Sequence, residues 1–381
     1  MLRIVPTQSA ARAKDYFSRS DYYTEGQEWD GVWRGKGADR LGLAGRVEQA
    51  DFDALCDNRH PAAGGRLTAC DRANRTVGYD FNFHAPKSLS LLHAVTDDPR
   101  LLRAFQDAVD DTMRLIEADM RTRVRKGYRY QDRTTGEMVW ARFDHLTARP
   151  IDGVPDPHLH SHCFVVNATF DRGEGEWKAG QFRDLKRDAP YYQAAFHADL
   201  TARLRGLGVP LEQTPDGWEV RGVERATLEK FSRRTRLIDG LAAERGITDP
   251  GEKAGLGAKT REGKSRHLTM AELRGVWADR LDPAERDGLR RILTHPTRTP
   301  AGGLDVRAAR DYACRHLFER QSVVAERQLL AEMLRAGLGR FSAREAAEEV
   351  ARSDVIVREV DGRRLATTRA VLREEADLVA F

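Results

Sequence analysis

The sequence lacks the features that mark membrane and secreted proteins. No apolar run approaches the roughly 20 residues that a membrane-spanning helix needs, and the N-terminal residues MLRIVPTQSAARAK contain no apolar core of a signal peptide. Internal repeats and low-complexity tracts are also missing. We therefore expect a cytoplasmic protein with no membrane insertion.

Cysteine is scarce as well. The four cysteines are scattered and no two of them form a CxxC pair: Cys56, Cys70, Cys163 and Cys314. Such spacing favours reduced, mostly packed thiols over a disulfide framework. The cysteine usage thus agrees with a cytoplasmic location.

Neither sign of charge dominates. The chain has 63 lysines and arginines against 59 aspartates and glutamates, a formal net charge of +4, and a pI near 8.9. A nucleic-acid partner is compatible with this balance, but so is an ordinary soluble enzyme. The 381 residues, of which 40% are hydrophobic, suffice for two or three domains with ordinary cores.

What the sequence does contain is a mixture of strand and helix patterns, which predicts an α+β protein. A helix is expected at 9–17 with Ser9 as its N-cap, and apolar spacing predicts a longer helix within 98–126. The run 158–170 is apolar and β-forming enough to be a central strand. Further strands are expected at 2–4, at 79–83, at 127–132 and 138–145 joined by the turn 133–137, and in a hairpin around Pro215-Asp216-Gly217.

The pattern changes along the chain. Beyond about residue 225 it is almost wholly helical, apart from a Gly- and Lys-rich stretch at 250–267 that predicts a mobile linker. We place domain boundaries near 225 and 300, which gives a core at 1–225, a helical region at 226–300 and a helical segment at 301–381. Within the linker, 257–265 imitates a phosphate loop, but Ala258 stands where that motif needs glycine and no strand precedes it.

The strongest chemical signal is a histidine run on the predicted central strand. Alternate side chains of a strand share a face, so His160 and His162 point the same way. Neutral imidazoles are good metal ligands. Histidines that merely hydrogen-bond in a polar core are the alternative, but so many of them so close together favour a metal.

A third ligand has two candidates. His158 continues the alternation, and His145 ends the preceding strand on the face of Val139, Ala141 and Phe143. The residues alone leave this choice open. A site of three histidines suits Zn, Mn, Co or Ni on ligand softness, and Mg less well.

Tyrosines gather near the N-terminus, with Tyr16 in the first predicted helix and Tyr22 and Tyr23 shortly after it. A tyrosine hydroxyl has an ordinary pKa of about 10, so it is a poor nucleophile without help. A metal that neutralises a phosphate and a nearby base would make it competent. Without the histidines, these tyrosines would be read as packing residues.

Four motifs together give the chain its resemblance to a known family. They are DYFSRSDYY, VGYDFNFHAPKSLSLLHA, FDHLTARPIDGVPDPHLHSHCFVVNAT and, more weakly, FSRRTRLI, and they span roughly the first 300 residues. In this order they resemble the N-terminal relaxase domain of MobF-type conjugative relaxase–helicases. The resemblance implies an HUH-type fold, an antiparallel sheet flanked by helices with a helical fingers extension, in a bacterial cytoplasmic protein.

The resemblance also implies an activity and its residues. Relaxases of this family nick and rejoin one DNA strand at a plasmid transfer origin through a 5′-phosphotyrosine, with one divalent metal ion, here Mg, Mn or Zn. The family pattern implies His145, His160 and His162 as ligands and Asp80 as the partner of a ligand histidine. It implies Tyr16 as the first nucleophile, and Tyr22 and Tyr23 as the second tyrosine group. The loop before His160 is longer than in the F-plasmid type, which keeps His158 in competition.

The implied partners are single-stranded DNA, the transfer-origin hairpin, relaxosome accessory proteins and a coupling protein. Relatives continue into a helicase, and residues 305–381 resemble the start of one. Basic side chains that could hold phosphates on this account are Lys87, Arg123, Arg125, Lys126, Arg233 and Arg234. A solvated surface explains their charge equally well.

Three other functions fit some of the same residues. A rolling-circle replication initiator or HUH transposase shares the paired histidines, but here the tyrosines precede the histidines, as in relaxases. A tri-histidine metallohydrolase would act through metal-bound water and leave Tyr16 dispensable. A DNA-binding module with vestigial ligands would bind DNA and form no covalent adduct.

Overall fold

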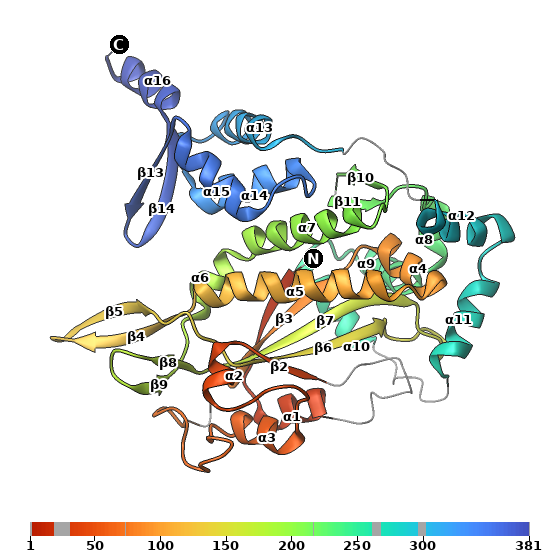
Figure 1. Cartoon of the computed structure of the whole chain (residues 1–381), viewed down its shortest axis with the longest axis horizontal. Coiled ribbons are helices and arrows are strands. Elements are labelled where there is room, and N and C mark those ends of the chain that lie inside the picture. Colours follow the sequence, from red (N-terminus) through yellow and green to blue (C-terminus); the bar gives the residue numbers. More distant parts are fainter. Residues whose placement is uncertain are drawn as a thin grey trace.

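The computed structural model describes residues 2–18, 31–72, 74–215, 217–260, 268–295 and 302–380. A five-stranded antiparallel sheet lies at its centre (Figure 1). The central strand is the predicted histidine strand, which runs slightly shorter than expected. The strands in sheet order are β1 (Leu2–Thr7), β3 (Gly78–His84), β7 (Pro157–Val166), β6 (Trp140–Thr147) and β2 (Val32–Arg34).

Helices cover both faces of the sheet. On one face, α4 (Lys87–Thr96), α5 (Pro99–Ala118) and α7 (Ala189–Gly206) bury side chains such as Phe81 and Val165. On the other face, α1 (Ala10–Ser18), α2 (Lys36–Arg40) and α3 (Gln49–Cys56) pack against side chains such as Phe143 and Phe164. Because neighbouring residues of a strand point to opposite faces, the alternation of the strands separates these two cores.

The predicted helix cap and hairpin are confirmed. Ser9 accepts a hydrogen bond from the Arg12 backbone N–H at 3.2 Å, and α1 begins at the next residue. The strands β10 (Leu211–Thr214) and β11 (Gly217–Val220) pair antiparallel around the expected turn, of which Asp216 lies outside the described residues. A small hairpin, β8 (Thr169–Asp171) with β9 (Glu176–Lys178), and α6 (Phe182–Arg187) lead into α7.

The prediction that strands 127–132 and 138–145 pair with each other is wrong. Instead, β4 (Arg121–Lys126) pairs with β5 (Arg129–Thr134) as a separate hairpin, and α5 ends at Ala118 rather than near 126. The turn explains the difference, because Gly127 and Tyr128 both have positive φ, as a tight two-residue hairpin requires. We call β4–β5 the basic hairpin; it projects from the molecule in Figure 1.

Residues beyond 225 form α8 (Arg225–Lys230), α9 (Arg233–Glu244), α10 (Pro250–Lys259), α11 (Met270–Asp279) and α12 (Pro283–Thr294). The prediction of a linker over 250–267 is wrong for its first part, which is α10. Asp249 caps that helix by accepting from the Glu252 backbone N–H at 2.9 Å, with proline at the first helical position. Residues 261–267 lie outside the described part of the chain.

The C-terminal segment is not purely helical. Its helices are α13 (Val306–Phe318), α14 (Glu326–Gly337), α15 (Ala343–Arg352) and α16 (Arg369–Ala380), and its sheet has the order β12 (Val324–Ala325), β14 (Arg363–Thr368), β13 (Val355–Val360). The sequence reading missed this sheet. Asp361 and Gly362, both with positive φ, form the tight turn between β13 and β14.

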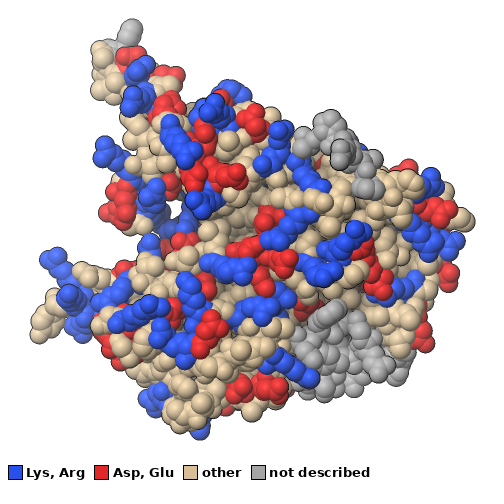
Figure 2. Space-filling model, in the orientation of Figure 1, with Lys and Arg blue, Asp and Glu red and all other residues tan. Residues whose placement is uncertain are grey.

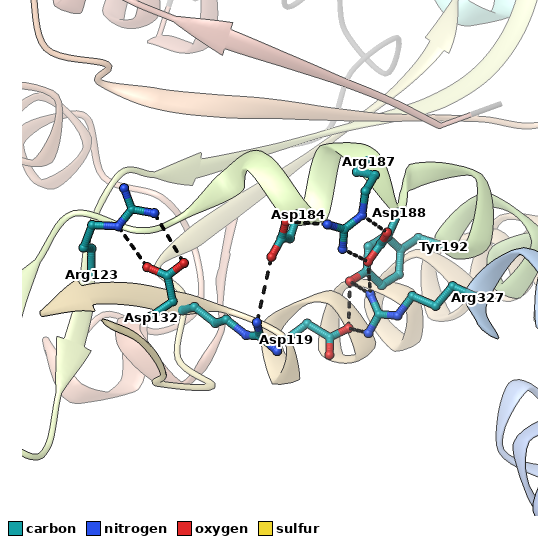
Figure 3. A network of polar contacts seen from close by, with 9 residues as sticks. Asp119, Arg123, Asp132, Asp184, Arg187, Asp188, Tyr192 and Arg327 are labelled. Atoms are coloured by element: carbon teal, nitrogen blue, oxygen red, sulfur yellow. Dashed lines mark hydrogen bonds and ion pairs between the residues drawn. The ribbon is translucent and has the colours of Figure 1, made fainter. Parts of the chain in front are cut away.

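A half-buried arginine joins this segment to the core (Figure 3). Arg327 on α14 donates to Asp188 at 2.9 Å, to the Tyr192 hydroxyl at 2.6 Å and to Asp119 at 2.5 Å. The Tyr192 hydroxyl itself donates to Asp119 at 2.7 Å, and burial raises its pKa. The segment from 302 onward thus packs on α5 and α7, while the boundaries near 225 and 300 stay predictions. Among the described helices, none is long and apolar enough to span a membrane.

Candidate active site

The histidines meet on the three middle strands of the sheet. His160 on β7 pairs with His84 on β3 and with His145 on β6. His162, two residues further on, lies on the same face, which is the face that α1 and α3 cover. The prediction that His160 and His162 share a face is confirmed.

Three of these rings are in mutual contact. The ring centroids of His145 and His160 are 5.0 Å apart, those of His145 and His162 are 5.0 Å apart, and those of His160 and His162 are 5.3 Å apart. The structure therefore brings together the three residues that the family pattern implied. They come from two adjacent strands in direct register.

Two of the three rings are held by a hydrogen bond at Nδ1. His162 Nδ1 donates to Asp80 Oδ2 at 2.9 Å, and His160 Nδ1 donates to the backbone carbonyl of His158 at 2.9 Å. Because carboxylates and carbonyls only accept, Nδ1 carries a proton in both rings. Carboxylate and carbonyl partners of this kind are what orient histidine ligands in metal sites.

The protonation state of His160 also suits the binding of a metal cation. Burial, followed by the neighbouring histidines, keeps the pKa of His160 well below its usual value, so the ring is neutral at pH 7. The Oδ1 atom of Asp80 is buried and has no hydrogen-bond partner among the described residues. A buried carboxylate oxygen without a partner is costly, so it indicates a ligand that meets it.

Within the described residues, no three His, Cys, Asp or Glu side chains already have their donor atoms gathered for a metal ion. The chemistry of the three histidines nevertheless fits one. The three rings touch each other, and in two of them a hydrogen bond to an acceptor fixes the proton on Nδ1.

His158 belongs to a different pair. Its Nε2 lies 3.0 Å from His84 Nδ1, and its ring stacks on His84 and touches His160. The described contacts of His158 do not include His162, whereas His145 touches both His160 and His162. The geometry thus favours His145 over His158 as the third member of the group.

The sequence reading missed His84. Burial lowers the pKa of His84 to about 3, so this ring is also neutral. A signal was present, because Asp80, Asn82 and His84 alternate along one strand and therefore share a face. The predicted strand ended one residue too early to include it.

The tyrosines can be placed only in part. Tyr16 lies in the last turn of α1, the helix whose Ala13 is buried on the histidine face of the sheet. Its side chain is not among those described, and Tyr22 and Tyr23 lie outside the described residues. The backbone thus brings the helix of Tyr16, but no described tyrosine side chain, to the histidine face.

Three of the predicted DNA-contacting side chains are engaged inside the fold. Lys87 donates to the Pro157 carbonyl at 3.0 Å, and burial lowers its pKa. Arg233 binds Asp156 at 3.0 Å, and Arg234 donates to the Gly257 carbonyl at 2.6 Å. Lys87 and Arg233 thus bind the chain that leads into β7, and Arg234 links α9 to α10. These contacts support a structural role for the three side chains rather than a DNA contact.

The other three lie on the basic hairpin. Arg123 pairs with Asp132 at 3.0 Å, and Arg125 lies over Tyr128 and Tyr130 at 5.5 and 5.9 Å. Tyr128 is 90% exposed and Tyr130 is 68% exposed, which is unusual for residues of their size. Figure 2 shows basic side chains at this projecting end of the molecule. Exposed aromatic rings beside arginines are typical of nucleic-acid surfaces.

Comparison with known proteins decides the family, because the model of the TrwC relaxase family matches residues 10–284. The chain belongs to the TrwC relaxase family. The prediction of a MobF-type relaxase and of its α+β fold is thereby confirmed.

A curated relative is the Escherichia coli protein described as multifunctional conjugation protein TraI, which is 30% identical over 327 residues. The match covers 82% of this chain and 17% of that protein, so the chain spans about a fifth of the length of the curated relatives it matches.

Solved relatives cover a similar part of the chain. The metal-bound structure of the conjugative relaxase TrwC in complex with oriT DNA is 30% identical with a TM-score of 0.65, and covers 74% of this chain and 97% of that one. TrwC complexed with a 27-mer DNA comprising the recognition hairpin and the cleavage site is 28% identical with a TM-score of 0.63, over the same shares of the two chains.

Proposed function

We propose that this TrwC-family relaxase nicks and rejoins one DNA strand at a plasmid transfer origin, with Tyr16 as nucleophile and a divalent metal ion held by His145, His160 and His162. One observation carries the proposal: three mutually touching histidines, one of them bonded to Asp80, lie on the sheet face that the helix of Tyr16 covers. The metal-bound and DNA-bound TrwC structures support it.

The reaction is a transesterification. The Tyr16 hydroxyl attacks the phosphorus of the scissile phosphodiester in line, the bond from phosphorus to the 3′-oxygen breaks, and the 3′-hydroxyl leaves with a proton. The product is a 5′-phosphotyrosine, in which a new phosphoester bond replaces the one that breaks. Because the number of phosphoester bonds is unchanged, the step is reversible and needs no ATP. When bound, the metal ion would supply positive charge that offsets the growing charge on the phosphate oxygens.

Asp80 has two tasks in this reaction. Its Oδ2 accepts the hydrogen bond from His162 Nδ1, which fixes the proton on that nitrogen and orients the ring. Its buried Oδ1, which has no hydrogen-bond partner among the described residues, can accept the proton of the Tyr16 hydroxyl. A tyrosine hydroxyl with a pKa near 10 needs such an acceptor at neutral pH.

The proposed activity is tested by incubating the full chain with labelled oligonucleotides from the transfer origin of its own element, with Mn²⁺ or Mg²⁺. Denaturing electrophoresis should show a cleaved 5′ fragment and a DNA–protein adduct that EDTA prevents. Cleavage without any adduct would instead support a metal-water hydrolase. Binding without cleavage on the authentic sequence would support a DNA-binding module.

Changing Asp80 to Asn should weaken metal binding by about 10- to 100-fold, because the amide no longer fixes the donor tautomer of His162. Isothermal titration calorimetry with Mn²⁺ measures this. Asn82 lies on the same strand and face, and Asn82→Ala is the matched control with an expected small effect. Equal metal affinity in the wild type and Asp80→Asn would contradict the role of Asp80.

We further propose that the basic hairpin contacts DNA, through Arg123, Arg125 and Lys126 to phosphates and Tyr128 and Tyr130 to bases. Changing Arg125 and Lys126 to Gln should lower DNA affinity and reduce the salt slope by about 1 for each lost phosphate contact. Fluorescence anisotropy across a salt series measures both quantities. Arg225→Gln, which changes an exposed arginine on α8, is the control. An equal loss of DNA affinity in that variant would contradict a specific role of the basic hairpin in DNA binding.

Other partners follow from the same activity. We expect the chain to act with relaxosome accessory proteins and with a coupling protein. We expect this in a bacterial cytoplasm. Co-purification of the chain with the accessory proteins of its own plasmid tests the association.

A further inference from the structure

A pocket unrelated to the histidines opens beside the start of α1. Its volume is about 530 Å³, and four arginines line it: Arg59, Arg66, Arg72 and Arg75. Two acidic residues, Asp57 and Asp71, share the lining. Four positive side chains against two negative ones make this a cationic cavity.

The acidic residues are largely occupied. Asp57 is bound to Lys14 at 2.7 Å, and Asp71 lies 3.6 Å from Arg66 and 3.9 Å from Arg75. Arg75 also donates to the Cys56 carbonyl, which anchors it in the wall. The aspartates thus neutralise Lys14 and one arginine rather than the whole pocket.

Arg59 and Arg72 have exposed side chains, and among the described residues neither guanidinium has a hydrogen-bond or ion-pair partner. An arginine that is not paired with a carboxylate side chain can bind a phosphate with two hydrogen bonds. The α1 helix begins at the pocket with Ala10 and has no acidic residue in its first turn, so its dipole adds to the positive potential.

The pocket lies on the histidine side of the sheet but at the other end of β3. Val77, in its wall, directly precedes β3, whereas His162 pairs with Asn82. Five residues of strand span about 17 Å, a distance that several nucleotides of a single strand can cover. The helix of Tyr16 runs from the pocket along the same face.

We propose that this pocket, the Arg59–Arg72 pocket, binds a backbone phosphate of single-stranded DNA, several nucleotides away from the phosphate at the histidines. The inference rests on the proposed function, because that function brings a single strand to this face. The ligand chemistry is a phosphate group, and a free phosphate or nucleotide is the other possible source.

The test is the affinity of the full chain for fluorescein-labelled dT20, measured by anisotropy across a salt series. The double substitution Arg59→Gln and Arg72→Gln should weaken binding about tenfold near 0.15 M salt and reduce the salt slope by about 1.4, since each contact to a single strand contributes about 0.7. Arg225→Gln is the control and should change neither value. Both arginines are exposed, so the variant should fold, which circular dichroism checks.

Unchanged dT20 affinity and slope in the double variant would overturn the proposal. So would a loss confined to the binding of inorganic phosphate or ATP, titrated in parallel, because the ligand would then be a free anion. The measurement requires no cleavage, so an absence of nicking would contradict the proposed function and leave this result standing.

Discussion

Changing Tyr16 to Phe is expected to abolish the covalent DNA–protein product and to leave DNA affinity essentially unchanged. The substitution removes the hydroxyl that we propose as the nucleophile and keeps the aromatic ring. Electrophoretic detection of the adduct, together with anisotropy for binding, measures both expectations. The effect should be complete, because no other group can form a phosphotyrosine at that position of α1.

Two controls make this result specific. Tyr312→Phe alters a partly exposed tyrosine on α13, in the C-terminal segment, and should retain full adduct formation. The double variant Tyr22→Phe and Tyr23→Phe should also retain the first cleavage, since the family pattern implies these residues as the second tyrosine group and not as the first nucleophile. An adduct that persists in Tyr16→Phe would show that another residue is the nucleophile.

Replacing His160 by Ala should reduce nicking by about a thousandfold or more, because transition-state charge stabilisation contributes several kcal/mol. His160 contacts His145 on the neighbouring strand and His162 on its own strand. The same variant should lose its metal, which inductively coupled plasma mass spectrometry of the purified protein detects without any activity measurement.

The paired variants His145→Ala and His158→Ala decide the third ligand. His145 touches both other rings, so its loss should remove the metal. His158 supports His160 through its backbone carbonyl, which alanine retains, so His158→Ala should keep the metal. The opposite outcome, metal lost in His158→Ala and retained in His145→Ala, would transfer the ligand role to His158.

Much of the site could be predicted because strand alternation is a short-range property. The spacing of His160 and His162 fixes their common face wherever the strand lies, and the apolar run around them makes the strand central. Ser9 could be identified as a cap for the same reason, since capping depends on residues within one helical turn. Register between strands is not local, and only the family pattern singled out His145.

Other features depend on contacts between residues that helix or strand periodicity does not relate. The basic hairpin escaped prediction because Gly127 and Tyr128 turn the chain within a charged stretch that also has helical spacing on its N-terminal side. The C-terminal sheet was hidden because its three strands are short and partly polar. The arginines of the Arg59–Arg72 pocket come from an irregular segment, where no repeat relates one side chain to the next.

The measurement that tests the central claim most directly is mass spectrometry of the adduct. The chain is incubated with the transfer-origin oligonucleotide and Mn²⁺, then digested with trypsin and nuclease. Cleavage after Lys14, Arg19 and Arg34 separates Tyr16 from Tyr22 and Tyr23, since they fall in the peptides DYFSR and SDYYTEGQEWDGVWR. The account predicts a nucleotide phosphate on DYFSR. A modified SDYYTEGQEWDGVWR with unmodified DYFSR, or cleaved DNA with no modified peptide, would contradict it.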